Sequence, residues 1–388
     1  MGFADFRGNP EVVWRLRQML ARDRFPHAVI LAGARGAGKY TLAQMLAKAM
    51  NCLERPLTPA ISPQSIQDFK TDRNLGGDSQ PEPENLPDFC GRCSNCLRIA
   101  QADELEARVG EAIEARESLR ESEKRETRIL VQTHAEVMII PPDPPQMLVK
   151  VDQVRHVIGS IYFKPGEGRQ KVYIFPEPAF MKEAANALLK VLEEPPEFAT
   201  IFLLAENAGS LLPTIRSRCI SLTLAPLGLE EIEQELRGRT GWSADQRTLV
   251  ARLSGGAIGR ARGFDLDAYL NARHDALLIL KTAFPGMEHA ELFRATETYR
   301  AGAEGRERTE QLILSLYSLL RDLLAVQSKT PDLVRNIDIL PDLERLARGV
   351  NFAWLAAAAE RVGEVQSGMR RNLLRSLSLD ALAAALEI

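Results

Sequence analysis

Residues 33–40, "GARGAGKY", set the fold expected for this chain. They follow a short apolar run, "HAVILAG" (27–33), and precede a segment whose apolar residues recur at helical spacing. Strand, glycine-rich turn and helix in this order are typical of a phosphate-binding loop in a parallel α/β domain. The glycines let backbone amides face phosphate oxygens, and the start of a helix favours negative charge there. The candidate nucleotide-binding residues are therefore Gly33, Gly36, Gly38, Lys39, Tyr40 and Thr41.

Tyr40 departs from the pattern of this phosphate loop. A Ser or Thr hydroxyl normally stands there and binds Mg²⁺, and a phenol is too long for the same place. Thr41 comes one residue later and points about 100° further round the helix. The acidic motif expected after a second strand, "KVYIF" (171–175), is also absent, because Pro176-Glu177 follows instead of Asp. We expect neither Mg²⁺ binding nor ATP hydrolysis at this site, while binding of ATP or ADP stays open.

Further strands and helices alternate along the first half of the chain. "EVMII" (136–140), "KVYIF" and "TIFLLA" (200–205) indicate strands, and segments 150–161 and 184–194 indicate helices. This alternation predicts one doubly wound parallel sheet over residues 1–225. Beyond it strands vanish, which predicts a short helical unit over 226–268 and an all-α domain over 269–388.

The cysteines predict a metal centre. Cys90-x2-Cys93-x2-Cys96 provides three thiolates on a tight turn, and Cys52, directly after the first α/β helix, is the best fourth ligand for a tetrahedral zinc ion. His134 is an alternative fourth ligand that lies further along the chain. A closed site of four sulfurs is structural, since no position stays open for water. The fifth cysteine, Cys219, is expected in the core.

The segments around these cysteines form an inserted module, about residues 52–130. Residues 53–89 contain six prolines and few apolar residues, which indicates a mobile loop. Residues 101–130 are rich in Glu and Arg with a sparse apolar stripe, which indicates a solvated helix or pair of helices.

Composition excludes several classes of protein. The chain has 388 residues, 45% of them hydrophobic and 26% charged, so an ordinary globular core can form in two or three domains. The net charge of −3 gives no bulk attraction to nucleic acid. No apolar run reaches the roughly 18 residues of a membrane span, and the first residues lack a signal-peptide core. We therefore expect a cytoplasmic protein with no membrane partner.

The motifs together resemble a known family. The phosphate loop, the cysteines inserted after its helix, "NALLKVLEEPP" (186–196) and "LLPTIRSRC" (211–219) occur in this order in subunits of the bacterial DNA polymerase III clamp loader, and among them the delta-prime subunits are the most similar. The resemblance spans nearly the whole chain, from "FRGNPEVVWRLRQML" to "NLLRSLSLDALAAAL" (372–386).

The resemblance implies a RecA-like AAA+ domain with an inserted zinc module, followed by a helical lid and a helical collar. It implies assembly with the delta and gamma/tau subunits through collar and AAA+ faces, and a role in loading the sliding clamp on primed DNA. It makes Arg218 of "SRC" an arginine finger that reaches the ATP site of a neighbouring subunit. It also makes Arg260 of "SGGAIGRA" (254–261) a candidate second-sensor residue of the degenerate nucleotide site.

Two other functions compete with a delta-prime role. A working gamma/tau-type ATPase would show magnesium-dependent turnover that requires Lys39. A zinc module that binds nucleic acid would concentrate basic residues near Cys90–Cys96. The flanks instead mix Asp88 and Glu104 with Arg92 and Arg98.

Overall fold

A computed structural model describes residues 2–22, 25–59, 85–238, 241–281, 299, 302–369 and 375–386. The chain divides into two compact units, which are described separately. Unit 1 comprises Met1–Leu227 with Ala257–Gly259, and unit 2 comprises Gly228–Gly256 with Arg260–Ile388. In the described part of the chain, none of the helices combines the length and the apolar character that crossing a bilayer requires.

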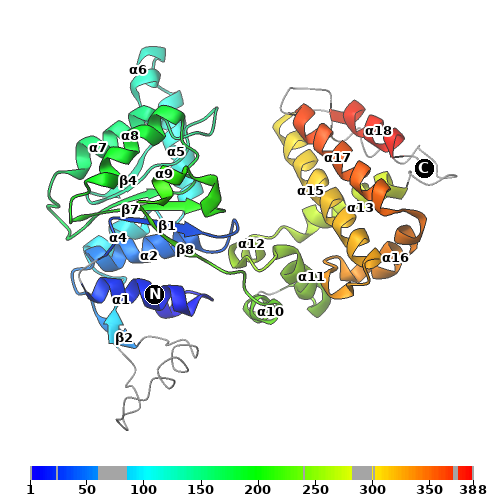
Figure 1. The fold of residues 1–388 in the computed structure, drawn as a ribbon, viewed down its shortest axis with the longest axis horizontal. Coiled ribbons are helices and arrows are strands. Elements are labelled where there is room, and N and C mark those ends of the chain that lie inside the picture. Colours follow the sequence, from blue (N-terminus) through cyan, green and yellow to red (C-terminus); the bar gives the residue numbers. More distant parts are fainter. Residues whose placement is uncertain are drawn as a thin grey trace, which may run out of the picture. The chain divides into compact units, whose positions relative to one another are not determined.

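Unit 1 is built on a mixed but mainly parallel sheet (Figure 1). The strand order is β4-β5-β6-β7-β1-β8, and every pairing is parallel except that of β4 with β5. The strands are β1 (Ala28–Ala32), β4 (Val131–His134), β5 (Val137–Ile139), β6 (Lys171–Phe175), β7 (Ala199–Ala205) and β8 (Ile220–Thr223). The predicted doubly wound sheet is confirmed. The antiparallel edge strand β4 was not predicted, because its sequence "VQTH" carries no apolar run.

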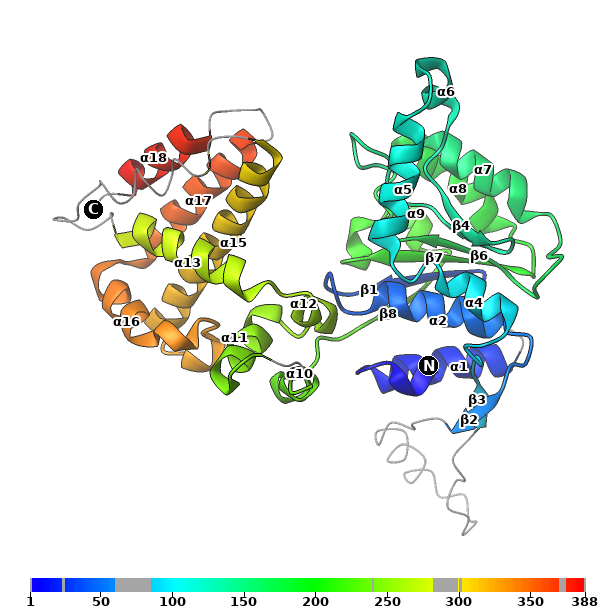
Figure 2. The same cartoon turned by 180° about the vertical axis from the view of Figure 1, so that it is seen from behind.

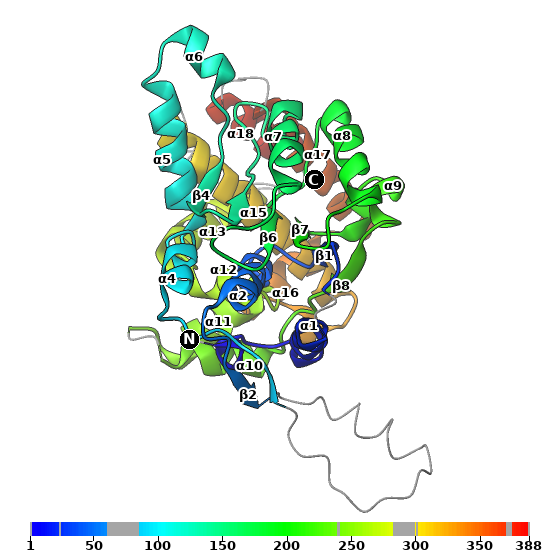
Figure 3. The same ribbon diagram turned by 90° about the vertical axis from the view of Figure 1, so that its left-hand side faces the viewer.

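Helices cover both faces of the sheet, as Figures 2 and 3 show. Alternate residues of β1 face opposite cores: Val29 and Leu31 pack with one set of helices, and Ala28 and Ile30 with the other. The helices of the first face are α1 (Pro10–Ala21), α2 (Lys39–Asn51) and α4 (Ser94–Ala100), and those of the second are α7 (Val151–Ile161) and α8 (Lys182–Glu193). Shorter elements are η1 (Phe3–Asp5), η2 (Ala208–Ser210) and α9 (Pro213–Arg216). Two buried faces explain why β1 is apolar throughout and why β7 is apolar except for the buried Thr200.

The inserted module is more regular than its sequence suggested. Where a mobile loop was expected over 53–89, the described ends form a hairpin, β2 (Leu57–Pro59) paired with β3 (Asn85–Pro87). Residues 60–84 lie outside the described part. The buried guanidinium of Arg17 on α1 holds this hairpin by donating to the carbonyls of Pro87 and Leu86 at 3.0 and 2.7 Å. The predicted pair of helices is present as α5 (Leu105–Glu117) and α6 (Glu121–Glu126).

Two local details differ from what the sequence pattern suggests. An asparagine before a proline commonly caps a helix, but the Asn9 side chain does not cap α1. Its Oδ1 accepts from the backbone amide of Ala225 at 2.7 Å, and its Nδ2 donates to the Ala225 carbonyl at 3.1 Å. Helix α2 was expected to bury one apolar face. In fact every residue from Leu42 to Asn51 is buried, including Gln44 and Lys48, because the inserted module covers the side opposite the sheet.

Unit 2 is all helical in its described residues, as expected for its sequence. Its elements are α10 (Leu229–Leu236), α11 (Ala244–Ser254), α12 (Ile258–Arg262, whose first two residues belong to unit 1), α13 (Leu266–Lys281), α15 (Gly302–Gln327), η3 (Pro331–Leu333), η4 (Ile337–Ile339), α16 (Leu340–Gly349), α17 (Phe352–Met369) and α18 (Arg375–Ala385). The predicted apolar face of α15 (Leu312, Leu316, Leu319, Leu323) lies in one core with α13, α16, α17 and α18. Buried Asp322 of α15 fixes the chain before η4 by accepting from the backbone amides of Arg335 and Asn336.

Candidate functional site

The phosphate loop has the backbone that its sequence predicted. β1 lies between β7 and β8, so the loop leaves the carboxyl edge of the sheet at a central strand. Gly33, Gly36 and Gly38 have φ values of +151°, +83° and +90°, a region that side chains disfavour. A Cβ on Gly33 would come within 2.9 Å of the Leu224 carbonyl oxygen. The glycines are thus required by conformation and close packing, and their contact with a nucleotide stays a prediction.

The side chain of Lys39 folds back and contacts backbone carbonyls of the phosphate loop. Its ammonium donates to the carbonyls of Gly33 and Ala34, the latter at 2.9 Å, and the residue is 9% exposed. Burial lowers its pKa, and the carboxylates of Glu206 and Glu177 act in the opposite direction. These two carboxylates would repel a phosphate bound at the loop, whereas Arg35, which also lowers the pKa of Lys39, would attract it.

Tyr40 points into the inserted module. Its hydroxyl donates to the carbonyl of Ala102, just after α4, and accepts from the amide of Gln44 at 2.6 Å. Burial raises the pKa of Tyr40, so the phenol stays neutral at physiological pH. Thr41 is exposed. The residue at the magnesium position of the loop is therefore engaged elsewhere.

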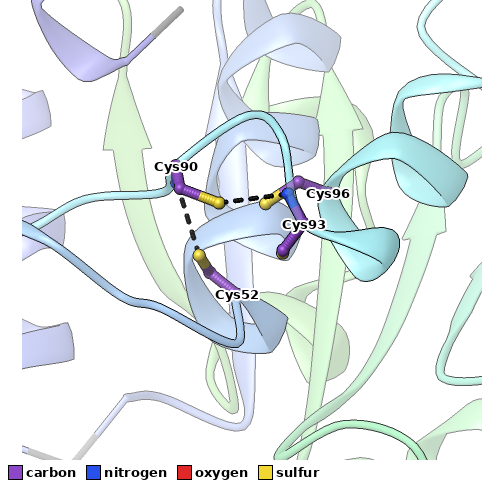
Figure 4. Close-up of side chains that lie close together, drawn as sticks. All are labelled: Cys52, Cys90, Cys93 and Cys96. Atoms are coloured by element: carbon purple, nitrogen blue, oxygen red, sulfur yellow. Dashed lines mark hydrogen bonds between the residues drawn. The ribbon is translucent and has the colours of Figure 1, made fainter.

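The four predicted cysteine ligands come together in one group, the cysteine cluster (Figure 4). Cys52 follows the end of α2, Cys90 and Cys93 lie in the loop after β3, and Cys96 lies on α4. Their sulfur atoms all lie within 4.8 Å of one another. Tetrahedral zinc with Zn–S bonds of about 2.3 Å needs sulfurs about 3.8 Å apart, so a small contraction of the cysteine cluster would complete the site. His134 is not among these ligands: it is buried in β4, and its Nδ1 accepts from the Glu136 backbone amide at 3.1 Å.

The surroundings of the cysteine cluster act on its sulfurs in different directions. Burial raises the pKa of Cys90 and of Cys96, whereas the pKa of Cys93 is lowered. Backbone amides of Arg55 and Cys90 donate to the sulfur of Cys52 at 3.2 and 3.3 Å, and the amide of Cys93 donates to that of Cys90 at 3.3 Å. Burial acts to raise the pKa of Cys93, but hydrogen bonds from backbone amides, including that of Cys96, outweigh it and bring the pKa to about 7. A sulfur-only donor set with amide support is the kind that structural zinc prefers. Cys219 lies half-buried against the other core, as expected.

Arg218 lies at the surface between α9 and β8. Its guanidinium donates to Glu193, the last residue of α8, at 2.6 Å, and to the carbonyl of Thr214 at 2.9 Å. One third of its side chain is exposed. The structure thus joins "NALLKVLEEPP" to "SRC" through one ion pair, a contact that the sequence did not reveal. Arg260 lies on α12 in unit 2 and is exposed. The roles of Arg218 and Arg260 stay predictions.

Comparisons with known proteins point to one group. A family model described as "DNA polymerase III, delta subunit" matches residues 78–228. The chain is 28% identical over 235 residues to DNA polymerase III subunit tau/gamma of Haemophilus influenzae, which covers 60% of this chain and 25% of that protein. It is 25% identical to subunit delta' of Pseudomonas aeruginosa (66% of this chain, 60% of that protein). It is 24% identical to subunit delta' of Bacillus subtilis over 87% of this chain and 84% of that protein. The chain spans about a quarter of the length of the tau/gamma relatives.

Proposed function

We propose that the chain is a clamp-loader subunit of the AAA+ family, and specifically the delta-prime subunit of a DNA polymerase III clamp loader, on the strength of its similarity to that group. In this role it completes a ring of related subunits that opens the sliding clamp and places it on primed DNA. Its own phosphate loop is structural, and its contribution to ATP hydrolysis is made at the neighbouring subunit.

The choice of delta-prime over a gamma/tau motor rests on one observation, that neither of the two expected magnesium ligands is present. Tyr40 stands where a magnesium-binding hydroxyl would be needed, and its phenol is bonded to Ala102 in the inserted module. Pro176 follows β6 where an acidic ligand would be needed. The loss of both ligands removes the cation that screens the transferring phosphate. The delta' relative from Bacillus subtilis, which aligns over most of both chains, supports the same choice.

Arg218 is the residue proposed to act in trans. A guanidinium stabilises charge that develops on the oxygens of a transferring phosphoryl group, and such fingers are worth about 10³–10⁵ in rate. Glu193, the Thr214 carbonyl and the Ser217 hydroxyl accept from three of the five N–H groups, so two others remain for a phosphate on the neighbouring subunit. Partial exposure at the surface suits a residue that must enter another subunit's site.

The proposed cofactor of the chain itself is one structural zinc ion. Cys52, Cys90, Cys93 and Cys96 would hold it, and its chemistry is to cross-link the module where hydrophobic core is scarce. ATP or ADP at the phosphate loop is a weaker proposal, supported by the glycine geometry and opposed by the carboxylates that act on Lys39.

A gamma/tau-type ATPase is the second candidate, favoured by the 28% identity to tau/gamma and by the intact loop with Lys39. Steady-state ATP turnover by the purified chain separates the two. We expect no magnesium-dependent turnover above that of Lys39→Ala, together with co-purification of the chain with the cognate delta and gamma/tau subunits. Turnover that disappears in Lys39→Ala would establish a motor, and failure to assemble with the other subunits would contradict both candidates.

A further inference from the structure

Helix α2 connects the two sites of unit 1. Its first residue, Lys39, ends the phosphate loop, and its last, Asn51, precedes the ligand Cys52. The helix has 13 residues and is about 20 Å long. Tyr40, Gln44 and Lys48 recur every fourth residue and therefore form one stripe along it. This polar stripe faces the inserted module.

Contacts run from this stripe to the turn after α4, the helix that carries Cys96. Tyr40 donates to the carbonyl of Ala102, and Lys48 forms an ion pair with Asp103 at 2.6 Å. Asn95 lies between the ligands Cys93 and Cys96. Near the other end of α2, its side-chain amide donates to the backbone carbonyl of Asn51 at 3.0 Å. The helix is thus attached to α4 and its turn both at the phosphate loop and at the cysteine cluster.

These contacts are largely buried. Gln44 is 1% exposed, and the Lys48 side chain is 9% exposed while Asp103 reaches solvent. A buried donor that loses its partner costs more than the bond itself contributed. If α4 shifted, the Tyr40 hydroxyl and the Lys48 ammonium would both lose partners. The first turn of α2 and the turn after α4 are therefore expected to become ordered together.

We propose that Tyr40 and Lys48 are positioning residues that link metal binding at the cysteine cluster to the order of the phosphate loop. Metal fixes α4 through Cys96, α4 fixes its following turn, and that turn holds Tyr40 beside Gly38 and Lys39. The linkage is reciprocal: a residue change at Tyr40 weakens metal binding at the far end of the helix. This inference does not depend on the role of Arg218 or on nucleotide binding.

The first test is zinc affinity of the full-length chain, measured by competition with a chromogenic chelator. Tyr40→Phe keeps the ring and removes the hydroxyl. We expect zinc affinity to fall about fivefold, the equivalent of one buried hydrogen bond. Tyr173→Phe is the matched control, because its hydroxyl bonds Ser160 of α7 at 2.9 Å on the other face of the sheet. It should leave zinc affinity unchanged. Equal affinities in wild type and Tyr40→Phe overturn the proposal.

The second test is hydrogen exchange of the wild-type chain with and without a chelator. Removing zinc should accelerate exchange at residues 36–42 several-fold and leave β6 and β7 protected. Unchanged exchange at 36–42 overturns the linkage, and so does equal acceleration at β6 and β7, which would make the effect global. If Tyr40→Phe does not fold, Lys48→Gln takes its place in the affinity test, with the same expected loss.

Discussion

The phosphate loop and the cysteine cluster lie at opposite ends of α2. They differ in which parts of a binding site they contain, the backbone or the ligand side chains. The loop keeps its backbone: three glycines at positive φ hold it beside β1 and α2. It has Tyr40 and Pro176 at the two positions where magnesium binding would be expected to need a hydroxyl and a carboxylate. The cluster has all four of its sulfurs within 4.8 Å of one another. The comparison teaches that the glycine backbone is informative about the fold. The side chains at positions 40 and 176 are informative about whether magnesium-dependent hydrolysis can occur.

The strongest test of this comparison is to measure ATP turnover of the reconstituted clamp loader with an alanine variant of Arg218 and with one of Lys39. Arg218→Ala should lower clamp-dependent ATP turnover by about 10³, because the neighbouring site would lose the proposed arginine finger. Lys39→Ala should change that turnover by less than about threefold, because the proposed delta-prime role assigns no hydrolysis to this loop. Turnover is measured at saturating ATP, clamp and primed DNA.

Arg216→Ala is the matched control, since Arg216 is an exposed arginine in the same segment. It should leave turnover unchanged, and assembly of all three variants should be normal by size-exclusion chromatography. If Lys39→Ala were as damaging as Arg218→Ala, the loop would be a working site.

Replacing a ligand tests the other end of α2. Cys93→Ser should reduce bound zinc from about one ion per chain to none after dialysis, because three sulfurs do not close a structural site. Cys219→Ser should keep its zinc, since Cys219 lies in the other core. Zinc is measured by elemental analysis of the purified chains. A full equivalent of zinc in Cys93→Ser would mean that another residue completes the site.

The predictable parts of the structure are those that rest on local patterns. Apolar runs placed β1, β6 and β7, and cysteine spacing identified all four sulfurs that gather in one cluster. What escaped prediction depends on contacts between distant segments. Gln44 and Lys48 are polar and lie outside the apolar face that the sequence indicates, yet the inserted module buries them. Glu193 lies within the 186–196 motif, but the motif does not indicate which residue it contacts, and its pairing with Arg218 appears only when α8 and α9 are packed.

The two ends of α2 should also differ in their contribution to stability. Asn51 is 1% exposed, and its side-chain oxygen accepts from the backbone amides of Arg169 and Gln170 at 3.0 and 3.1 Å. Asn51→Ala would leave both amides without this partner and should lower the free energy of unfolding by about 2–4 kcal/mol. Thr41→Ala, at an exposed position near the phosphate loop, should change it by less than about 0.5 kcal/mol. Urea denaturation of the zinc-bound chains measures both. Equal losses would contradict the asymmetry.

The smallest effect concerns His134, the alternative ligand of the cysteine cluster. Burial, with a smaller contribution from Arg98, lowers its pKa, and its Nδ1 must stay unprotonated to accept from Glu136. The unfolded chain therefore binds this proton more readily than the folded chain, and stability should fall as pH drops below about 6.5. The pKa of Glu136 is also lowered, although burial opposes the shift, so its contribution is lost only at lower pH, below about 4.5.

His134→Asn keeps an acceptor near the Glu136 amide and removes the titration. The free energy of unfolding between about pH 6.5 and pH 5 should then fall less steeply than in wild type. His134→Asn should also retain its zinc, because the four sulfurs suffice. Loss of zinc in this variant would place His134 among the ligands and remove the contrast between a complete cluster and a depleted loop.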